Sequence, residues 1–156
     1  MSYLESPDDR ILQEDLEVIA DSRLPFEKLK NASVLVTGAT GLVGVSLVRA
    51  LLCINRKRHL NIQILAMIRN REKAEKIYGD LLKREELKMI VGDINQKIEI
   101  EECVDYIIHC ASVTASKMIN DKAIAYGEAP PAAYYDLLNR QAKNQQESAK
   151  QLAGGI

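Results

Sequence analysis

The sequence predicts an α/β fold: a partial, doubly wound parallel sheet of about four strands, with flanking helices and an extra helix at the N-terminus. Three observations predict it. Continuous apolar runs typical of buried strands recur along the chain, segments of helical periodicity alternate with the first three runs, and 156 residues suffice for one core. Strands that alternate with helices favour parallel pairing through right-handed crossovers. The apolar runs lie at residues 32–38, 61–70, 87–94 and 103–112.

Residues 1–30 are expected to form an amphipathic helix and a connector before the main fold, which takes residues 31–156. Ser6 is predicted as the N-cap, with Pro7 at the first helical position. We expect this helix to be a packing or subunit-contact element, so the chain could form a homo-oligomer. Four apolar residues share its predicted buried face: Ile11, Leu12, Leu16 and Ile19.

Helices are expected between the strands and at the end of the chain. The first is apolar from its start, so Leu42 and Val43 are expected to be buried. The basic residues 55–59 are expected to be a solvated connector after it. Tyr78 lies on the apolar side of the second helix. The three predicted helices cover residues 42–52, 71–84 and 131–152.

The composition excludes several classes of partner. Since 21 basic residues nearly balance 22 acidic ones, no overall positive field would hold a nucleic acid or an anionic membrane. No apolar stretch has the length of a bilayer span, and the acidic start is unlike a secretory signal, so a cytoplasmic location is expected. Cys53, Cys103 and Cys110 form no CxxC pair and are expected to be buried, reduced thiols rather than metal ligands.

Three glycines at intervals of three follow the first strand in the stretch VLVTGATGLVG. A strand that ends at Thr37 and a helix that begins near Thr40 leave a tight turn whose amides and helix dipole favour an anion. Gly38 permits the turn, Gly41 lets a pyrophosphate approach the backbone, and Gly44 lets the helix pack closely. The glycines could instead simply make a short loop. Their place in the first strand–helix–strand unit, with a second strand about 20 residues on, favours dinucleotide binding.

The spacing GxxGxxG makes a family likeness specific. TGATGLVG resembles the cofactor turn of the short-chain dehydrogenase/reductase superfamily, particularly its extended branch of sugar-nucleotide epimerases, dehydratases and reductases. MIRN, VGDI and HCAS resemble, in order, the end of the second strand, the acidic turn after the third and the motif that closes the fourth. The resemblance covers residues 32–156, strongly as far as Ser112. It implies a Rossmann-like fold and an NAD(P) cofactor.

By this resemblance, the glycine turn would hold the pyrophosphate. Where an acidic residue would bind the adenosine ribose, the sequence has Arg69, with Arg71 beside it. A guanidinium can grip a 2′-phosphate, so NADP is favoured and NAD is the alternative. Either arginine could instead be a solvated residue at a helix start. The pyrophosphate positions are Gly38, Ala39, Thr40, Gly41, Leu42, Val43 and Gly44.

The remaining implied contacts follow the third and fourth strands. Asp93 and Ile94 resemble a pair that contacts the adenine, although Asp93 could equally cap a turn. His109 is expected to be a packed residue at a strand end rather than a catalytic base, because no nearby carboxylate is evident to orient it. Three small residues would line the ribose and nicotinamide side: Cys110, Ala111 and Ser112.

The catalytic pair of the superfamily is absent from this sequence. Its chemistry needs a tyrosine with a lysine four residues later, and none of the six tyrosines has one. We expect the catalytic half to lie outside this chain; loss of an internal stretch is the other explanation. The expected function is the NAD(P)-binding portion of an epimerase, dehydratase or reductase that transfers hydride on a nucleotide-sugar-like substrate. The alternatives are a non-catalytic NADP(H)-binding sensor and a flavodoxin-like phosphate binder.

Overall fold

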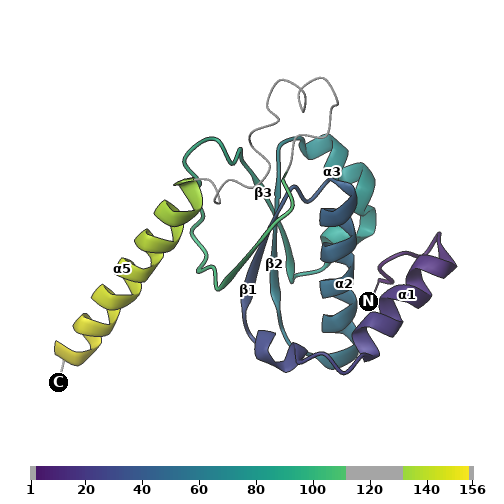
Figure 1. Ribbon diagram of the computed structural model, residues 1–156, viewed down its shortest axis with the longest axis horizontal. Helices are drawn as coiled ribbons and strands as arrows, with labels where there is room; N and C mark the ends of the chain where they lie inside the picture. The colour runs from purple at the N-terminus through teal and green to yellow at the C-terminus, as the bar shows by residue number, and fades with distance from the viewer. Residues whose placement is uncertain (1–2, 112–131, 155–156) are drawn as a thin grey trace.

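The computed structural model describes residues 3–111 and 132–154 as a sheet with helices on both sides (Figure 1). The sheet is parallel, with the strand order β3-β2-β1-β4, which confirms the predicted α/β fold. The strands are β1 (Ser33–Thr37), β2 (Gln63–Ile68), β3 (Leu87–Val91) and β4 (Tyr106–His109). The helices are α1 (Arg10–Asp21), α2 (Leu42–Arg58), α3 (Arg71–Tyr78) and α5 (Ala132–Gly154), with short 3-10 helices η1 (Phe26–Leu29) and η2 (Gly79–Lys83).

The order of the strands places β1 between β2 and β4. Leu35 of β1 is in register with Leu65 of β2 and with Ile107 of β4. The chain therefore winds outward from β1 to β3 and then returns to the other side of β1 as β4. Ligands of open α/β sheets bind outside the carboxyl ends of the strands, at such a reversal of strand order.

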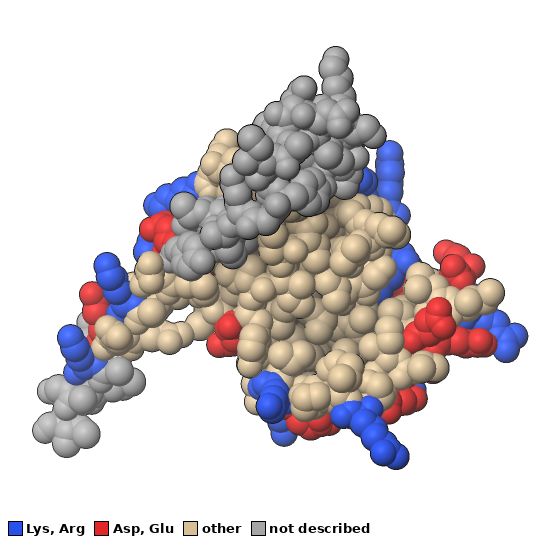
Figure 2. Space-filling view, viewed as in Figure 1, with Lys and Arg blue, Asp and Glu red and all other residues tan. Residues whose placement is uncertain are grey.

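Each face of the sheet has its own apolar core, because successive strand residues point to opposite faces. Val34 and Val36 of β1 pack with α1, α2 and α3, whereas Leu35 packs on the opposite face with Leu137 of α5. The uncharged surface in the middle of Figure 2 is bordered by charged side chains. No helix among the described residues has the length and apolar character needed to cross a membrane.

The N-terminal helix packs against α2 (Figure 1), but it begins later than the sequence predicts. The Asp9 side chain, not Ser6, caps it, because the carboxylate accepts a hydrogen bond from the Leu12 amide at 3.0 Å. Leu16 is buried as expected, whereas Ile11 is 74% exposed, so the predicted face was partly wrong. The domain division at residue 30 and the homo-oligomer stay predictions.

The basic residues 55–59 are not a solvated connector. The helix α2 continues through Arg58, and its last turn carries cations that pair with α1 and with the connector that follows it. A basic last turn also complements the negative end of the helix dipole. The prediction failed because these acidic partners come from a distant part of the sequence. The pairs are Arg56 with Glu17 at 2.9 Å, Lys57 with Asp21 at 2.5 Å and Arg58 with Glu27 at 2.8 Å.

A buried carboxylate fastens the start of the chain to the same region. The side chain of Glu5 is fully buried and pairs with Arg84 at 2.7 Å and with Arg56 at 3.0 Å. Gln13 donates a further hydrogen bond to it at 3.0 Å. Burial opposes ionisation of Glu5, but the hydrogen bonds from these three side chains outweigh it and lower its pKa to about 2. Glu5 is therefore a carboxylate at neutral pH.

Two predictions about burial were wrong. Leu42 is 88% exposed and Val43 is 59% exposed, because the buried side of α2 carries Gly44, Val48 and Leu51 instead. Cys53 is buried, but Cys103 is exposed in the loop before β4, and Cys110 is half-buried. The exposed leucine and valine lie at the glycine turn, where the candidate site begins.

Candidate functional site

The glycine turn lies at the carboxyl end of β1 and is fixed by backbone hydrogen bonds to both neighbouring strands. The Ala39 amide donates to the Met67 carbonyl of β2 at 3.2 Å. The Cys110 amide, just after β4, donates to the Thr37 carbonyl at 3.2 Å. Within the turn, the Gly41 amide donates to the Gly38 carbonyl at 2.9 Å. The turn is therefore a fixed loop built into the sheet.

Gly38 and Gly44 are required by the fold itself. Gly38 has a φ of +63°, and a Cβ there would lie 2.6 Å from the Cys110 carbonyl oxygen and from the Ala111 amide nitrogen. A Cβ at Gly44 would lie 2.2 Å from the Gly38 carbonyl oxygen. A real Cβ does not approach backbone so closely, so both positions need glycine for the packing of β4 and α2 against the turn.

Gly41 is different, because the fold restricts a side chain there less than at Gly38 or Gly44. A Cβ at Gly41 would meet only the Gly38 carbonyl oxygen, at 3.3 Å, and its φ is negative. Gly41 is also the N-cap of α2, and no side chain caps this helix. Packing therefore demands glycine less strongly here than at Gly38 or Gly44, and a ligand that approaches the backbone would be a further reason for it.

The amides around Gly41 are available to an anion. The amides of Leu42, Val43 and Gly44 begin α2 and so have no acceptor within the helix. No described residue accepts a hydrogen bond from them or from the amide of Thr40. They surround the positive end of a helix of 17 residues. This arrangement can bind a phosphate or diphosphate through the backbone.

A tyrosine from another helix holds this turn. The hydroxyl of Tyr78, the last residue of α3, donates a hydrogen bond to the Ala39 carbonyl. Tyr78 is 3% exposed, and burial raises the pKa of its phenol, so it is neutral. The sequence predicts Tyr78 on the apolar side of its helix but indicates no role for it at the site. The signal was there, since a buried tyrosine hydroxyl needs a partner.

The two arginines after β2 have different surroundings. Arg69 lies exposed between the end of β2 and the start of α3, and it forms no hydrogen bond or ion pair with a described residue. Arg71 is the first residue of α3 and pairs with Glu75 one turn further on, at 3.2 Å. Asn70 between them caps the helix by accepting from the Lys73 amide at 2.9 Å. Only Arg69 thus keeps an uncommitted guanidinium at the carboxyl edge of the sheet.

Asp93 and Ile94 follow β3 at the same edge. The Asp93 side chain accepts from both the amide and the side chain of Asn95, each at 2.9 Å, which is the turn-capping role that the sequence left open. Ile94 is half-buried and packs against the core on the α5 side of the sheet. An adenine contact by this pair stays a prediction.

The residues after β4 border the glycine turn. The half-buried residues Cys110 and Ala111 form the wall that Gly38 contacts, and burial raises the pKa of the Cys110 thiol. His109 is exposed, and its Nδ1 lies 3.1 Å from the Thr37 hydroxyl, which joins the ends of β4 and β1. Ser112, the third small residue of the predicted nicotinamide side, lies outside the described residues.

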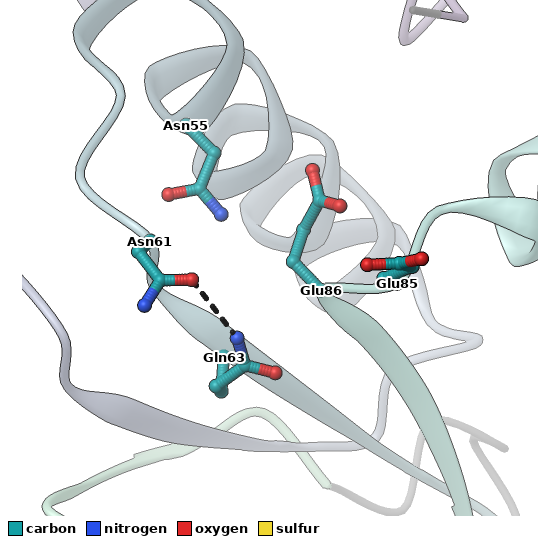
Figure 3. Close-up of a pocket in the computed structure, with 5 residues that line it drawn as sticks. All are labelled: Asn55, Asn61, Gln63, Glu85 and Glu86. Carbon is teal, nitrogen blue, oxygen red and sulfur yellow. Dashed lines mark hydrogen bonds between the residues drawn. The ribbon is translucent and has the colours of Figure 1, made fainter. Parts of the chain in front are cut away.

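A hollow of about 250 Å³ lies at the opposite, amino end of the strands (Figure 3). Its lining residues are Asn55, Asn61, Gln63, Glu85 and Glu86, and the three amide side chains among them form hydrogen bonds. The Asn55 side chain donates to the Ile62 carbonyl at 2.8 Å and accepts from the Ile62 amide at 2.9 Å. Gln63 donates to Asn61 at 3.3 Å. Both the oxygen and the nitrogen of the Asn55 side chain thus bond the backbone of Ile62, just before β2. We therefore interpret this part of the hollow as structural.

Most of the chain matches the model of one known protein family. Residues 34–147 match a model described as the NAD dependent epimerase/dehydratase family. None of the curated proteins compared matches the chain. The matched span begins in β1 and includes the glycine turn, Arg69, Asp93 and most of α5.

Proposed function

Because the chain belongs to the NAD dependent epimerase/dehydratase family, we propose that it binds a nicotinamide dinucleotide at the glycine turn and prefers NADP to NAD. One observation carries the proposal. Gly41 stands beside amides that no described residue accepts from, and a Cβ there would meet one atom at 3.3 Å, against contacts of 2.6 Å at Gly38 and 2.2 Å at Gly44. A diphosphate laid across the turn would use these amides and could approach the backbone at Gly41, which has no side chain.

Some residues of the turn would maintain its shape, and others would bind the ligand. Gly38 and Gly44 keep β4 and α2 close, and this closeness brings the amides together. Thr40, Leu42 and Val43 would offer their amides to the diphosphate. The exposed side chains of Leu42 and Val43 would border the ligand and exclude water from it. Ala39 is fully buried and so would act through its backbone only.

Arg69 supports the choice of NADP. Its guanidinium is exposed at the end of β2, where the adenosine ribose of a dinucleotide lies in this type of fold. With no carboxylate at residues 67–70, nothing there would repel a 2′-phosphate. Charge-assisted hydrogen bonds from a guanidinium to a phosphate are among the strong ones. Asp93 and Ile94 would border the adenine, and Cys110, Ala111 and Ser112 the nicotinamide side.

The reaction class is inferred from the family, and the reaction would require the complete catalytic machinery of that family. When bound, the cofactor supplies hydride transfer, here proposed to act on a nucleotide-sugar-like substrate. The sequence holds no tyrosine with a lysine four residues later, so this chain would bind the cofactor without turning over substrate alone. The same absence also favours a second candidate, a non-catalytic NADP(H)-binding module. Turnover of a nucleotide sugar by this chain would contradict both.

Calorimetric titration with NADPH and NADH tests the proposal. We expect both cofactors to bind, NADPH more tightly, and each to raise the melting temperature. Arg69→Asp should reverse the preference, because the new carboxylate repels the 2′-phosphate and can accept from ribose hydroxyls. Arg71→Asp is the matched control: it makes the same charge change two residues away, at a helix start that tolerates an acid.

The outcomes separate the two parts of the proposal. If neither cofactor binds at millimolar concentration, the site assignment is wrong. If both bind but Arg69→Asp leaves the preference unchanged, the site stands and Arg69 is not the source of the preference. If Arg71→Asp shifts the preference as much as Arg69→Asp, a general charge effect explains the result.

A further inference from the structure

We propose that Tyr78 is a positioning residue for the diphosphate: its buried hydroxyl sets the orientation of the Ala39–Thr40 peptide, so that the Thr40 amide faces the anion. This inference rests on the proposed function and adds to it a residue from outside the glycine turn. Tyr78 lies 39 residues after Ala39 in the sequence and comes from a different helix. Its role cannot be found from the spacing of the glycines.

The phenol of Tyr78 is held in place from two directions. The helix α3 ends at Tyr78, because Gly79 takes a φ of +48° and donates its amide to the Glu75 carbonyl. From α2, Arg49 donates to the carbonyl of Ile77 at 3.3 Å and ties the end of α3 to α2. The ring itself packs in the apolar core between the helices and the sheet. The hydroxyl therefore has a fixed position relative to the turn.

The Ala39–Thr40 peptide is fixed by this contact. The Ala39 amide is already bonded to β2 through Met67, and its carbonyl accepts from Tyr78. Because a trans peptide is planar, the N–H of Thr40 points opposite to the carbonyl of Ala39. A carbonyl that is drawn toward the core therefore turns this N–H outward. No described residue accepts from the Thr40 amide. The contact thus aims one donor at the anion site before a ligand arrives.

Removal of the hydroxyl separates this role from packing. Phenylalanine fills the same space as tyrosine but leaves the buried Ala39 carbonyl without its partner. The peptide then gains freedom to rotate, and part of the binding free energy goes into fixing it again. Since the diphosphate is common to both cofactors, the loss should be equal for NADPH and NADH. A change in the 2′-phosphate contact would instead alter their ratio.

The experiment measures NADPH and NADH binding by calorimetry for the wild type, Tyr78→Phe and two control variants. We expect Tyr78→Phe to weaken both cofactors by about three- to tenfold, with their ratio unchanged. Ile54→Val removes one methyl group from a buried position in α2 and controls for loss of stability. Tyr106→Phe removes a hydroxyl from an exposed tyrosine of β4. Neither control should change the affinity.

Nuclear magnetic resonance supplies a readout that a purely structural role would not move. In the wild type, NADPH should shift the Thr40 amide proton strongly, and in Tyr78→Phe this shift should shrink relative to those of Leu42 and Val43. The inference is overturned if Tyr78→Phe binds as the wild type does, or if Ile54→Val weakens binding equally. In either case the cofactor site itself would stand. If the wild type binds neither cofactor, the proposed function and this inference fail together.

Discussion

The two ends of the sheet carry polar groups that differ in how fully they are paired. At the amino end, Asn55 uses both its oxygen and its nitrogen on the Ile62 backbone, and Glu5 lies buried among Arg84, Arg56 and Gln13. At the carboxyl end, the amides at the start of α2 have no described acceptor, and Arg69 has no described partner. Both ends are polar, and the ligand site that we propose lies at the carboxyl end.

This difference separates residues that hold the fold from residues that bind a ligand. Paired groups contribute to stability and have little left to offer a partner. Unpaired donors at an exposed helix start cost the fold little, because water solvates them, and they gain most when an anion replaces the water. Substitutions at the amino end should therefore change stability without affecting binding. Ligand-facing substitutions at the carboxyl end should do the reverse.

The largest loss of stability is expected from Arg84→Met at the amino end. The change leaves the Glu5 charge buried with fewer donors, which typically costs about 3–5 kcal/mol. Urea unfolding measures this loss, and calorimetry should give an unchanged NADPH affinity for the folded protein. Arg10→Met is the control, since Arg10 and Glu14 form an exposed pair. Equal losses in the two variants would show that the buried network is no stronger than a surface pair.

Acid should weaken the same end of the molecule. The pKa of Glu5 is lowered from 4.5 to about 2 in the folded state, so the unfolded chain takes up its proton at a higher pH. The stability from Glu5 is therefore complete above pH 4.5 and is lost as the pH falls toward 2, by at most about 3 kcal/mol. Unfolding free energies measured across this range should fall less steeply in Glu5→Gln than in the wild type. Parallel curves would contradict the assignment.

The glycine turn contains both kinds of residue, so two alanine substitutions sharpen the comparison. Gly44→Ala forces a methyl group against the Gly38 carbonyl and should cost about 3 kcal/mol of stability. Gly41→Ala meets only one atom at 3.3 Å and should cost less than about 1 kcal/mol. Gly41→Ala should nevertheless weaken NADPH binding by tenfold or more, because the methyl group occupies the approach to the backbone. Thermal unfolding and calorimetry measure the two effects.

Two results would contradict this contrast between Gly41 and Gly44. If Gly41→Ala keeps full affinity, the diphosphate does not approach the backbone at Gly41. If Gly41→Ala destabilises the protein as much as Gly44→Ala, Gly41 is a structural glycine like its neighbours. Either result would remove the observation that carries the proposed function.

The smallest effect is expected from Arg71→Gln. Arg71 and Glu75 are about two-thirds and half exposed, and such helix pairs contribute about 0.3–0.5 kcal/mol. The melting temperature should hardly change, and the ratio of NADPH to NADH affinity should stay constant. A lowered ratio would mean that Arg71 contacts the 2′-phosphate together with Arg69. The ion pair with Glu75 would then not prevent Arg71 from binding the ligand.

Local sequence patterns predicted the sheet well. The apolar runs gave β1 to β4 close to their observed ends, and the glycine spacing placed the start of α2 beside β1. The contacts of the N-terminal segment with the rest of the chain could not be predicted. The prediction of a connector at residues 55–59 is wrong because the acidic partners of this stretch lie in α1 and the segment after it, and helix periodicity carries no information about them.

The sequence predicts the candidate site only where its residues are contiguous and form a motif. The glycine turn is contiguous in the sequence, so its residues were named together, and their binding role stays a prediction. Tyr78 was missed because its partner is a backbone carbonyl far away in the sequence, which no side-chain pattern records. For Asp93, the sequence left a turn cap and an adenine contact open, and the structure adds the bonds to Asn95.

The closeness of Gly38 to the backbone after β4 has a consequence for synthesis on the ribosome. Ala111, which forms part of that wall, follows Thr37 by 74 residues. A nascent chain that has emerged only through β1, α2 and β2 lacks one side of the loop and cannot yet give it its final shape. Contacts between such distant residues form late and slowly. The proposed cofactor site would therefore be complete only once the fourth strand has joined the sheet.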